Sequence, residues 1–170
     1  MESKDNMAIT YDKIATTTLG STSATITFSS IAATYTDLRL VLVGTNTAAL
    51  NINSTFNGDT GSNYSLTTLS GDGATVTGAD SLTQTSIRVN NTSMAVSQPY
   101  FITMDIFSYA GSTLKTCLVT ASEDKNGSGT TGIRVGIWAS TSAITSITFT
   151  TSTSTFAVGT TATLYGILKA

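Results

Sequence analysis

Serine and threonine make up roughly a third of this chain, and they alternate with apolar residues in short runs. The alternation is plainest in the segments Ala24–Phe28, Ala143–Phe149 and Leu164–Leu168. Because successive side chains of a β-strand point to opposite faces, such runs give each strand one core face and one hydroxyl-bearing face. Helical periodicity is nearly absent, and turn residues recur about every ten residues, as in β-sandwiches and barrels. The sequence therefore predicts an all-β fold.

The length of 170 residues fits one domain of roughly nine or ten strands. We expect a polar N-terminal arm over residues 1–8 and a single β-domain over residues 9–170, without a linker or an internal repeat. The expected strands are Ile9–Leu19, Ser23–Phe28, Leu38–Gly44, Ala49–Phe56, Ser86–Val96, Tyr100–Tyr109, Leu114–Ala121, Gly132–Trp138, Ala143–Thr150 and Thr161–Leu168.

Two of these segments indicate which side chains face the core. In the segment from Ile102 to Phe107, the alternation predicts that Ile102, Met104 and Ile106 share the inner face. Beyond Arg39, by contrast, the segment Leu38–Val43 is apolar on both faces. It is expected to be either a central strand or part of a subunit contact.

Three polar, glycine-bearing segments are expected to be loops: Asn57–Asn63, Ser70–Asp80 and Ser122–Gly129. The pair Asn57-Gly58 favours a tight hairpin turn, because both residues tolerate positive φ. The whole stretch from Asn57 to Thr85 is long for a simple connection. Long loops often carry binding sites, so this stretch is a candidate binding region.

Catalysis is disfavoured by the residues that the chain lacks. Without histidine there can be no Ser-His-Asp or Cys-His arrangement and no zinc site of the Cys/His type. Cys117 is the single cysteine, and we expect it to be a small buried strand residue. Glu123 is the only glutamate beyond the N-terminus, and no carboxylate pair for glycoside hydrolysis stands out. We therefore expect a protein that is not an enzyme and needs no cofactor.

Charge disfavours two classes of partner. The net charge is −2, and the eight lysine and arginine residues are scattered along the chain, whereas nucleic-acid binding needs a dense cationic surface. No apolar run reaches the length of a membrane span, and the N-terminus does not resemble a secretory signal. We expect a protein made in a cytoplasm that binds neither nucleic acid nor membrane.

Five residues form the candidate binding surface: Asn57, Asp59, Tyr64, Asp72 and Trp138. Aromatic rings in polar settings can stack on sugars, but a tryptophan near a sandwich rim more often belongs to a core or an interface. The acidic residues of the loops (Asp59, Asp72, Asp80 and Asp124) could ligate Ca²⁺. Their spacing matches no calcium loop that we know, and turns in which Asp bonds its own backbone are favoured.

An ordered set of short motifs runs through most of the chain. They are Tyr11–Ala15, Thr18-Leu19, Ile26–Ile31, Tyr35–Leu40, Phe56–Asp59, Asn63–Ser65 and Ala162–Ile167. This set resembles small structural proteins of tailed bacteriophages. The resemblance implies a jelly-roll β-sandwich that is a component of the virion, assembled as a homotrimer, and it carries over no catalytic residues.

Three functions follow as hypotheses. The leading one is a capsid decoration (cement) protein that binds the major capsid protein or other virion subunits and stabilises the head shell. The alternative is a tail- or head-fibre domain that recognises host glycans through the Asn57–Asp80 region, Tyr64 and Trp138. The third, an enzyme acting on polysaccharide, would require two carboxylates close together in a cleft.

Overall fold

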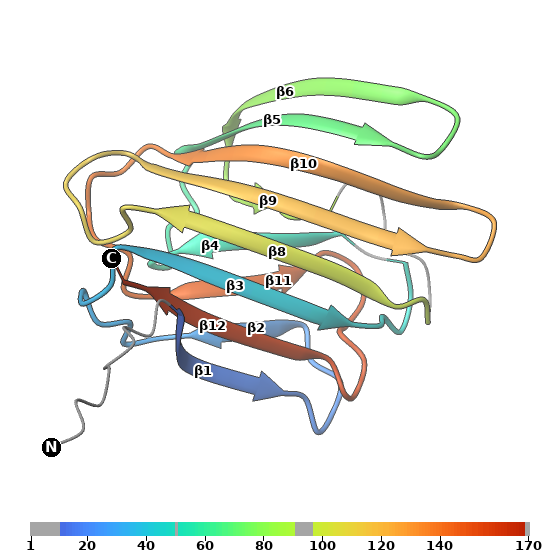
Figure 1. Cartoon of the computed structure of the whole chain (residues 1–170), viewed down its shortest axis with the longest axis horizontal. Coiled ribbons are helices and arrows are strands. Elements are labelled where there is room, and N and C mark those ends of the chain that lie inside the picture. Colours follow the sequence, from blue (N-terminus) through green and yellow to red (C-terminus); the bar gives the residue numbers. More distant parts are fainter. Residues whose placement is uncertain (1–10, 50, 91–96, 169–170) are drawn as a thin grey trace, which may run out of the picture.

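Figure 1 shows two β-sheets packed face to face in the computed structural model, which describes residues 11–49, 51–90 and 97–168. Within these residues, eight strands form the larger sheet (order β1-β12-β3-β8-β9-β10-β5-β6) and four form the smaller (order β2-β11-β4-β7). All neighbouring strands are antiparallel. The predicted all-β, antiparallel sandwich is therefore confirmed.

The strands have the following bounds. They are β1 (Tyr11–Thr18), β2 (Thr25–Phe28), β3 (Asp37–Gly44), β4 (Ile52–Phe56), β5 (Tyr64–Gly71), β6 (Val76–Gln84), β7 (Ile87–Arg88), β8 (Tyr100–Phe107), β9 (Lys115–Asp124), β10 (Gly129–Trp138), β11 (Ile147–Thr151) and β12 (Thr161–Ile167).

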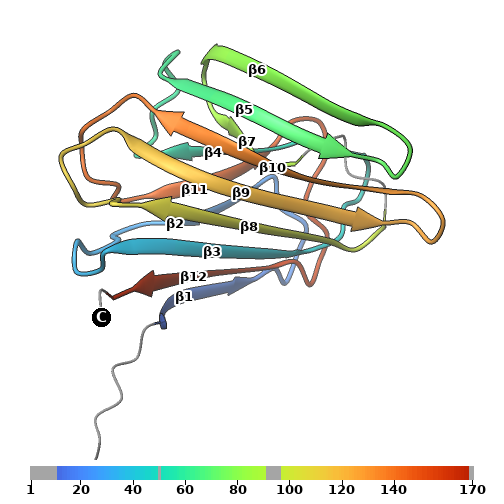
Figure 2. The same cartoon turned by 45° about the horizontal axis from the view of Figure 1, so that its top comes forward.

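Eight of the strands pair in a nested order. The first pairs with the last (β1 with β12), and β2 with β11, β3 with β8 and β4 with β7 follow inward along the chain. The remaining strands form two hairpins, β5–β6 and β9–β10, which extend the larger sheet beyond β8. Figure 2 shows these hairpins at one side of the molecule, with β1 at the opposite edge.

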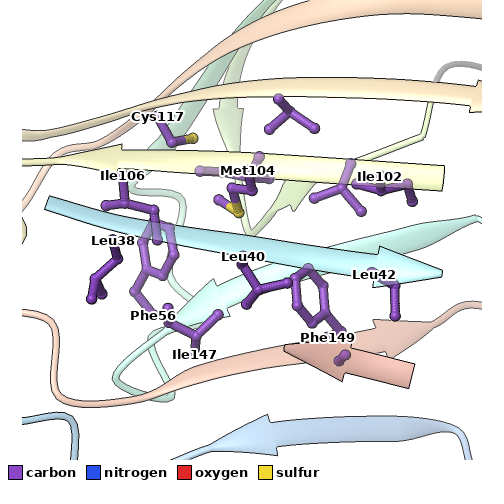
Figure 3. Close-up of a cluster of buried hydrophobic side chains, with 14 of the residues drawn as sticks. Leu38, Leu40, Leu42, Phe56, Ile102, Met104, Ile106, Cys117, Ile147 and Phe149 are labelled. Atoms are coloured by element: carbon purple, nitrogen blue, oxygen red, sulfur yellow. The ribbon is translucent and has the colours of Figure 1, made fainter. Parts of the chain in front are cut away.

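The core lies between the two sheets and is built from alternate residues of facing strands (Figure 3). The larger sheet contributes fully buried side chains from its central strands, and the smaller sheet contributes large side chains from β4 and β11. The main members are Leu38, Leu40, Leu42, Ile102, Met104, Ile106, Phe56, Ile147 and Phe149. The predicted inner face of the segment from Ile102 to Phe107 is therefore confirmed.

β3 is a central strand, with β12 on one side and β8 on the other, as one of the two interpretations of Leu38–Val43 predicts. Its inner residues, Leu38, Leu40 and Leu42, are buried. Its other face carries Val41 and Val43, and Val43 is about half exposed. An apolar surface thus remains open to solvent on the outside of the larger sheet.

The predicted loop from Asn57 to Thr85 is wrong, because this stretch contains the β5–β6 hairpin. With β5 and β6 included, the described residues form twelve strands rather than nine or ten. β6 is exposed over most of its length. A strand with solvent on both faces shows no apolar alternation, and for this reason the sequence pattern does not reveal it.

The tight turn at Asn57-Gly58 is confirmed, but the hairpin that it was expected to close is not. Both residues have positive φ (52° and 69°), and the Asp59 N–H donates to the Phe56 carbonyl at 2.9 Å. The turn leads from β4 in the smaller sheet to β5 in the larger one, so it joins two sheets.

The predicted loop Ser122–Gly129 is shorter than expected, since β9 continues to Asp124 and β10 begins at Gly129.

Four expectations lie wholly or partly outside the described residues: the arm over residues 1–8, the start of the first expected strand, residue 50 of the expected strand Ala49–Phe56, and residues 91–96 of the expected strand Ser86–Val96. The rest of that last strand contains the short β7. Within the described residues, no helix is long and apolar enough to span a membrane.

The buried face of β3 makes a direct prediction about stability. Leu40→Ala should lower the free energy of unfolding by about 3 kcal/mol, because it leaves a cavity between the sheets. Val43→Ala, on the opposite face of the same strand, should cost about 0.5 kcal/mol or less. Urea unfolding followed by the fluorescence of Trp138, the single tryptophan, measures both values. Equal losses would contradict the assignment of the two faces.

Candidate functional site

Four of the five predicted binding residues meet at one end of the sandwich, where β5 begins and β10 ends. Tyr64 and Trp138 are paired across these strands, and their rings are stacked with centroids 6.4 Å apart. Phe56 packs edge-on against Trp138 at 5.7 Å. Only 2% of Tyr64 and 3% of Trp138 is exposed. Both rings therefore belong to the core, as the core interpretation of Trp138 predicts.

Asp59 holds this aromatic cluster in place. Its Oδ2 accepts the Trp138 Nε1–H at 2.7 Å and the Asn63 Nδ2–H at 2.9 Å, and its Oδ1 accepts the Gly61 N–H at 2.8 Å. These hydrogen bonds lower the pKa of Asp59, and the bond from Trp138 has the largest effect. The Tyr64 hydroxyl donates to the Asp59 carbonyl at 3.0 Å, and burial raises the pKa of Tyr64 to about 12.

Asn57 ties the same turn to the segment that precedes β11. Its Oδ1 accepts the backbone N–H groups of Thr145 at 2.8 Å and Ser146 at 3.1 Å, and its Nδ2 donates to the Ala143 carbonyl at 2.8 Å. The polar groups of the turn are thus used within the protein. A role of Asn57, Asp59, Tyr64 and Trp138 in binding a ligand stays a prediction, and it would require this cluster to open.

Asp72, the fifth predicted residue, lies at the opposite end of β5, in the turn between β5 and β6. Its Oδ1 accepts the N–H groups of Thr75 at 2.7 Å and Ala74 at 2.9 Å, and these hydrogen bonds lower the pKa of Asp72. Asp124 bonds the Asn126 N–H in the same way at 2.8 Å. The turn interpretation is therefore confirmed for Asp72 and Asp124, whereas it is wrong for Asp80, which lies within strand β6. Among the described residues, no three His, Cys, Asp or Glu side chains are placed to hold a metal ion.

Asp72 lines an open groove of about 760 Å³ at this end of the larger sheet. The floor includes Val43 and Phe101, and 48% of Phe101 is exposed. The turns after β5 and β9 contribute the walls, and the full lining is Val43, Gly71–Gly73, Pro99–Phe101, Ser122–Asp124 and Gly127–Thr131. The groove combines an accessible aromatic ring with hydroxyl and carboxylate groups, and it is large enough for a small ligand.

The groove opens onto what we call the outer face, the side of the eight-stranded sheet turned away from the smaller sheet. Residues on this face form rows across β3, β8, β9 and β10. These rows are Val43, Phe101, Ser122 and Thr131; Val41, Thr103, Thr120 and Ile133; and Arg39, Asp105, Leu118 and Val135. Val43, Phe101, Ile133 and Val135 are each about half exposed. The outer face is therefore an extended surface that combines half-exposed apolar side chains with hydroxyl groups.

Hydroxyl groups on the outer face bond one another in pairs across neighbouring strands. On β1 and β12, Thr16 meets Thr163 at 3.1 Å and Thr18 meets Thr161 at 3.0 Å. Further along the sheet, the hydroxyls of Thr103 and Thr120 lie 2.5 Å apart, and those of Ser122 and Thr131 lie 3.0 Å apart. The predicted hydroxyl-bearing face is confirmed.

Charge on the three rows is confined to one ion pair. The Arg39 Nε and Nη2 donate to the Asp105 carboxylate at 2.5 and 2.6 Å, and this contact raises the pKa of Arg39. The guanidinium also lies 5.6 Å from the centre of the Tyr11 ring. Both charges are thus neutralised within the sheet.

The exposed apolar residues of this surface, such as Phe101 and Ile133, were not among the predicted binding residues. A signal for Phe101 was present, because alternation that points Ile102 and Met104 inward points Phe101 outward.

Cys117 is a buried strand residue as predicted, and burial raises the pKa of its thiol to about 12.

Comparison of the chain with models of protein families, with curated proteins and with solved structures finds no match.

The Asp59 cluster predicts a measurable effect on stability. Asp59→Ala should lower the free energy of unfolding by about 2 kcal/mol, because the Trp138 Nε1–H would stay buried without its charged acceptor. Asp80→Ala on the exposed strand β6 is the control and should change it by about 0.5 kcal/mol or less. Urea unfolding measures both, and a neutral Asp59→Ala would contradict the role of this carboxylate.

The same carboxylate predicts a pH dependence. Since the pKa of Asp59 is lowered in the folded chain, its ionised form stabilises the fold above the ordinary aspartate value of about 3.9. This contribution is lost as the pH falls through the lowered folded value. Between about pH 5 and pH 2, the wild-type protein should therefore lose more stability than Asp59→Asn does. Parallel stability profiles of the two proteins would contradict this prediction.

Proposed function

We propose that the protein is a non-enzymatic structural component of a tailed-phage virion, and specifically a capsid decoration protein. In this role it binds the major capsid protein or neighbouring virion subunits, as a trimer, and adds contacts that oppose expansion of the head shell. Three features support this role: the resemblance of the sequence motifs to phage structural proteins, the nested strand order and the outer face.

The nested pairing supports a jelly roll. In a jelly roll, one long antiparallel hairpin is folded over so that its first and last strands pair and inner pairs alternate between two sheets. The pairs β1–β12 and β3–β8 lie in the larger sheet, and β2–β11 and β4–β7 lie in the smaller one. This alternation supports a jelly roll whose larger sheet is widened by two hairpins, an architecture that viral coat proteins use.

The outer face is the observation that carries the proposal. Monomeric soluble proteins rarely expose large contiguous apolar surfaces, and such surfaces mark contacts with other proteins. Here half-exposed apolar side chains, including Val43, Phe101, Ile133 and Val135, lie on β3, β8 and β10 around a neutralised ion pair. Covering this surface would stabilise a complex by roughly 25 cal/mol for each square ångström of apolar area removed from water.

The decoration function is tested with virions from which the protein has been removed by deletion of its gene. Such heads should release DNA at a lower temperature than wild-type heads, and added purified protein should restore their stability. Ile133→Lys should abolish binding to the heads in co-sedimentation, because it places a charge in the apolar contact. Thr27→Lys is the control, since Thr27 is exposed on the smaller sheet.

Unchanged heat stability of the depleted heads would contradict the decoration function. Loss of binding by Thr27→Lys, with retention by Ile133→Lys, would contradict the outer face as the contact surface.

Recognition of host glycans by a fibre domain is a second candidate, and the groove favours it. Its volume lies in the range of small-molecule sites, and an exposed aromatic ring such as Phe101 can stack on the apolar face of a sugar. The hydroxyls of Ser122 and Thr131 and the carboxylate of Asp72 lie on the same lining. This candidate differs from the earlier expectation because it uses Phe101 rather than Tyr64 and Trp138.

A glycan array probed with the purified protein tests the second candidate. Phe101→Ala should abolish any binding in the groove, whereas Phe107→Ala should leave it unchanged. The two phenylalanines lie on the same strand and face with similar exposure, but only Phe101 lines the groove. Absence of binding by the wild-type protein, or equal loss in both variants, would contradict glycan recognition there.

A further inference from the structure

We propose that strand β6 is the edge at which two copies of this chain pair, antiparallel, about a two-fold axis at Ala79. The inference concerns self-association only and does not rest on the proposed function. Four strands form the sheet edges in the described part of the chain: β1, β2, β6 and β7.

Three of these edges carry features that discourage pairing with another chain. β2 has four residues and β7 has two, so each presents few free backbone groups. β1 carries Asp12 and Lys13, and its register is interrupted between Lys13 and Ala15. Short length, edge charges and bulges are the devices by which proteins protect sheet edges.

β6 lacks these protections over most of its length. It has nine residues, Val76–Gln84, without lysine, arginine or proline, and Asp80 is its single charged residue. The register with β5 is regular from Val76 to Ser81, and it is interrupted after Ser81, where Leu82 and Thr83 together stand opposite a single residue of β5. Figures 1 and 2 show β6 as the outermost strand, with no strand beyond it. Its outward N–H and C=O groups form a template for one more strand.

The side chains of β6 explain why the added strand is a second β6. On the outer face, Val76 and Leu82 are the most exposed large apolar residues of the described chain, at 74% and 72%. An antiparallel pair centred on Ala79 places Val76 of each copy opposite Leu82 of the other. The two-fold axis repeats this contact, so Val76 and Leu82 are covered in both copies.

Neighbouring registers are less favourable. Centring the pair on Asp80 places two carboxylates directly opposite each other, and centring it on Gly78 places Asp80 opposite Val76. A shift by one residue brings the outer face of one copy against the inner face of the other. The Ala79 register instead sets Thr77 opposite Ser81, which extends a hydroxyl pair that Thr77 already makes with Ser70 at 3.1 Å.

A charge exchange tests both the edge and the register by mass measurement in analytical ultracentrifugation. Val76→Lys with Leu82→Lys places lysine opposite lysine in both halves of the contact and should halve the mass of the particle. Val76→Lys with Leu82→Glu removes the same apolar groups but pairs opposite charges, so it should restore the wild-type mass. Within one copy, residues 76 and 82 lie about 20 Å apart, beyond the screening length of about 8 Å at physiological salt. The two introduced charges therefore act across the contact and not on each other within a copy.

The halving is expected whether the β6 pair is the whole assembly or joins two of the proposed trimers into a hexamer. A wild-type monomer, or any particle with an odd number of copies, would overturn the proposal. Equal masses for the two double variants would overturn the register.

A symmetric crosslink gives a second, independent measurement. Ala79→Cys should form a disulfide-linked dimer under mild oxidation, because residues directly opposite across the axis have Cα atoms within disulfide range, about 4.4–6.8 Å. Thr77→Cys is the control and should stay uncrosslinked, since it faces Ser81. Cys117 does not compete, because it is buried. Crosslinking of Thr77→Cys in preference to Ala79→Cys would also overturn the register.

Discussion

The core between the two sheets sets the direction of the side chains throughout the sandwich. Leu40 and Met104 of the larger sheet and Phe149 of the smaller sheet are fully buried in it. Because side chains alternate along a strand, filling the inner positions also fixes which residues face outward. The apolar residues of the outer face, such as Val43 and Phe101, are therefore held in place by the same packing that stabilises the fold.

The two sheets differ in width, and this difference explains where the structure is exposed. Eight strands face four, so the smaller sheet cannot cover the whole inner side of the larger one. The β5–β6 hairpin extends past that cover, and most of β6 is in solvent. An edge strand of this kind contributes little to the core, and its sequence is free of the alternation that the core demands elsewhere.

The same physical difference separates what the sequence predicts from what it does not. Ile102, Met104 and Ile106 were placed correctly because burial on one face requires an apolar residue at every second position. β6 was missed because neither of its faces is buried. The turn at Asn57-Gly58 could be predicted, since positive φ is a local property, whereas its path between sheets depends on packing far along the chain. Asp59 and Trp138 are 79 residues apart in sequence, so their hydrogen bond leaves no local pattern.

The hydroxyl pairs of the outer face have a consequence for the cost of removing water from it. A buried hydroxyl without a partner costs about 1–3 kcal/mol, so a threonine-rich surface would ordinarily demand matching polar groups from whatever covers it. Here Thr103 already bonds Thr120, and Thr16 already bonds Thr163. These groups keep a hydrogen bond when dehydrated, so a purely apolar partner can cover them. Such a surface can adhere to chemically different or imperfectly complementary neighbours.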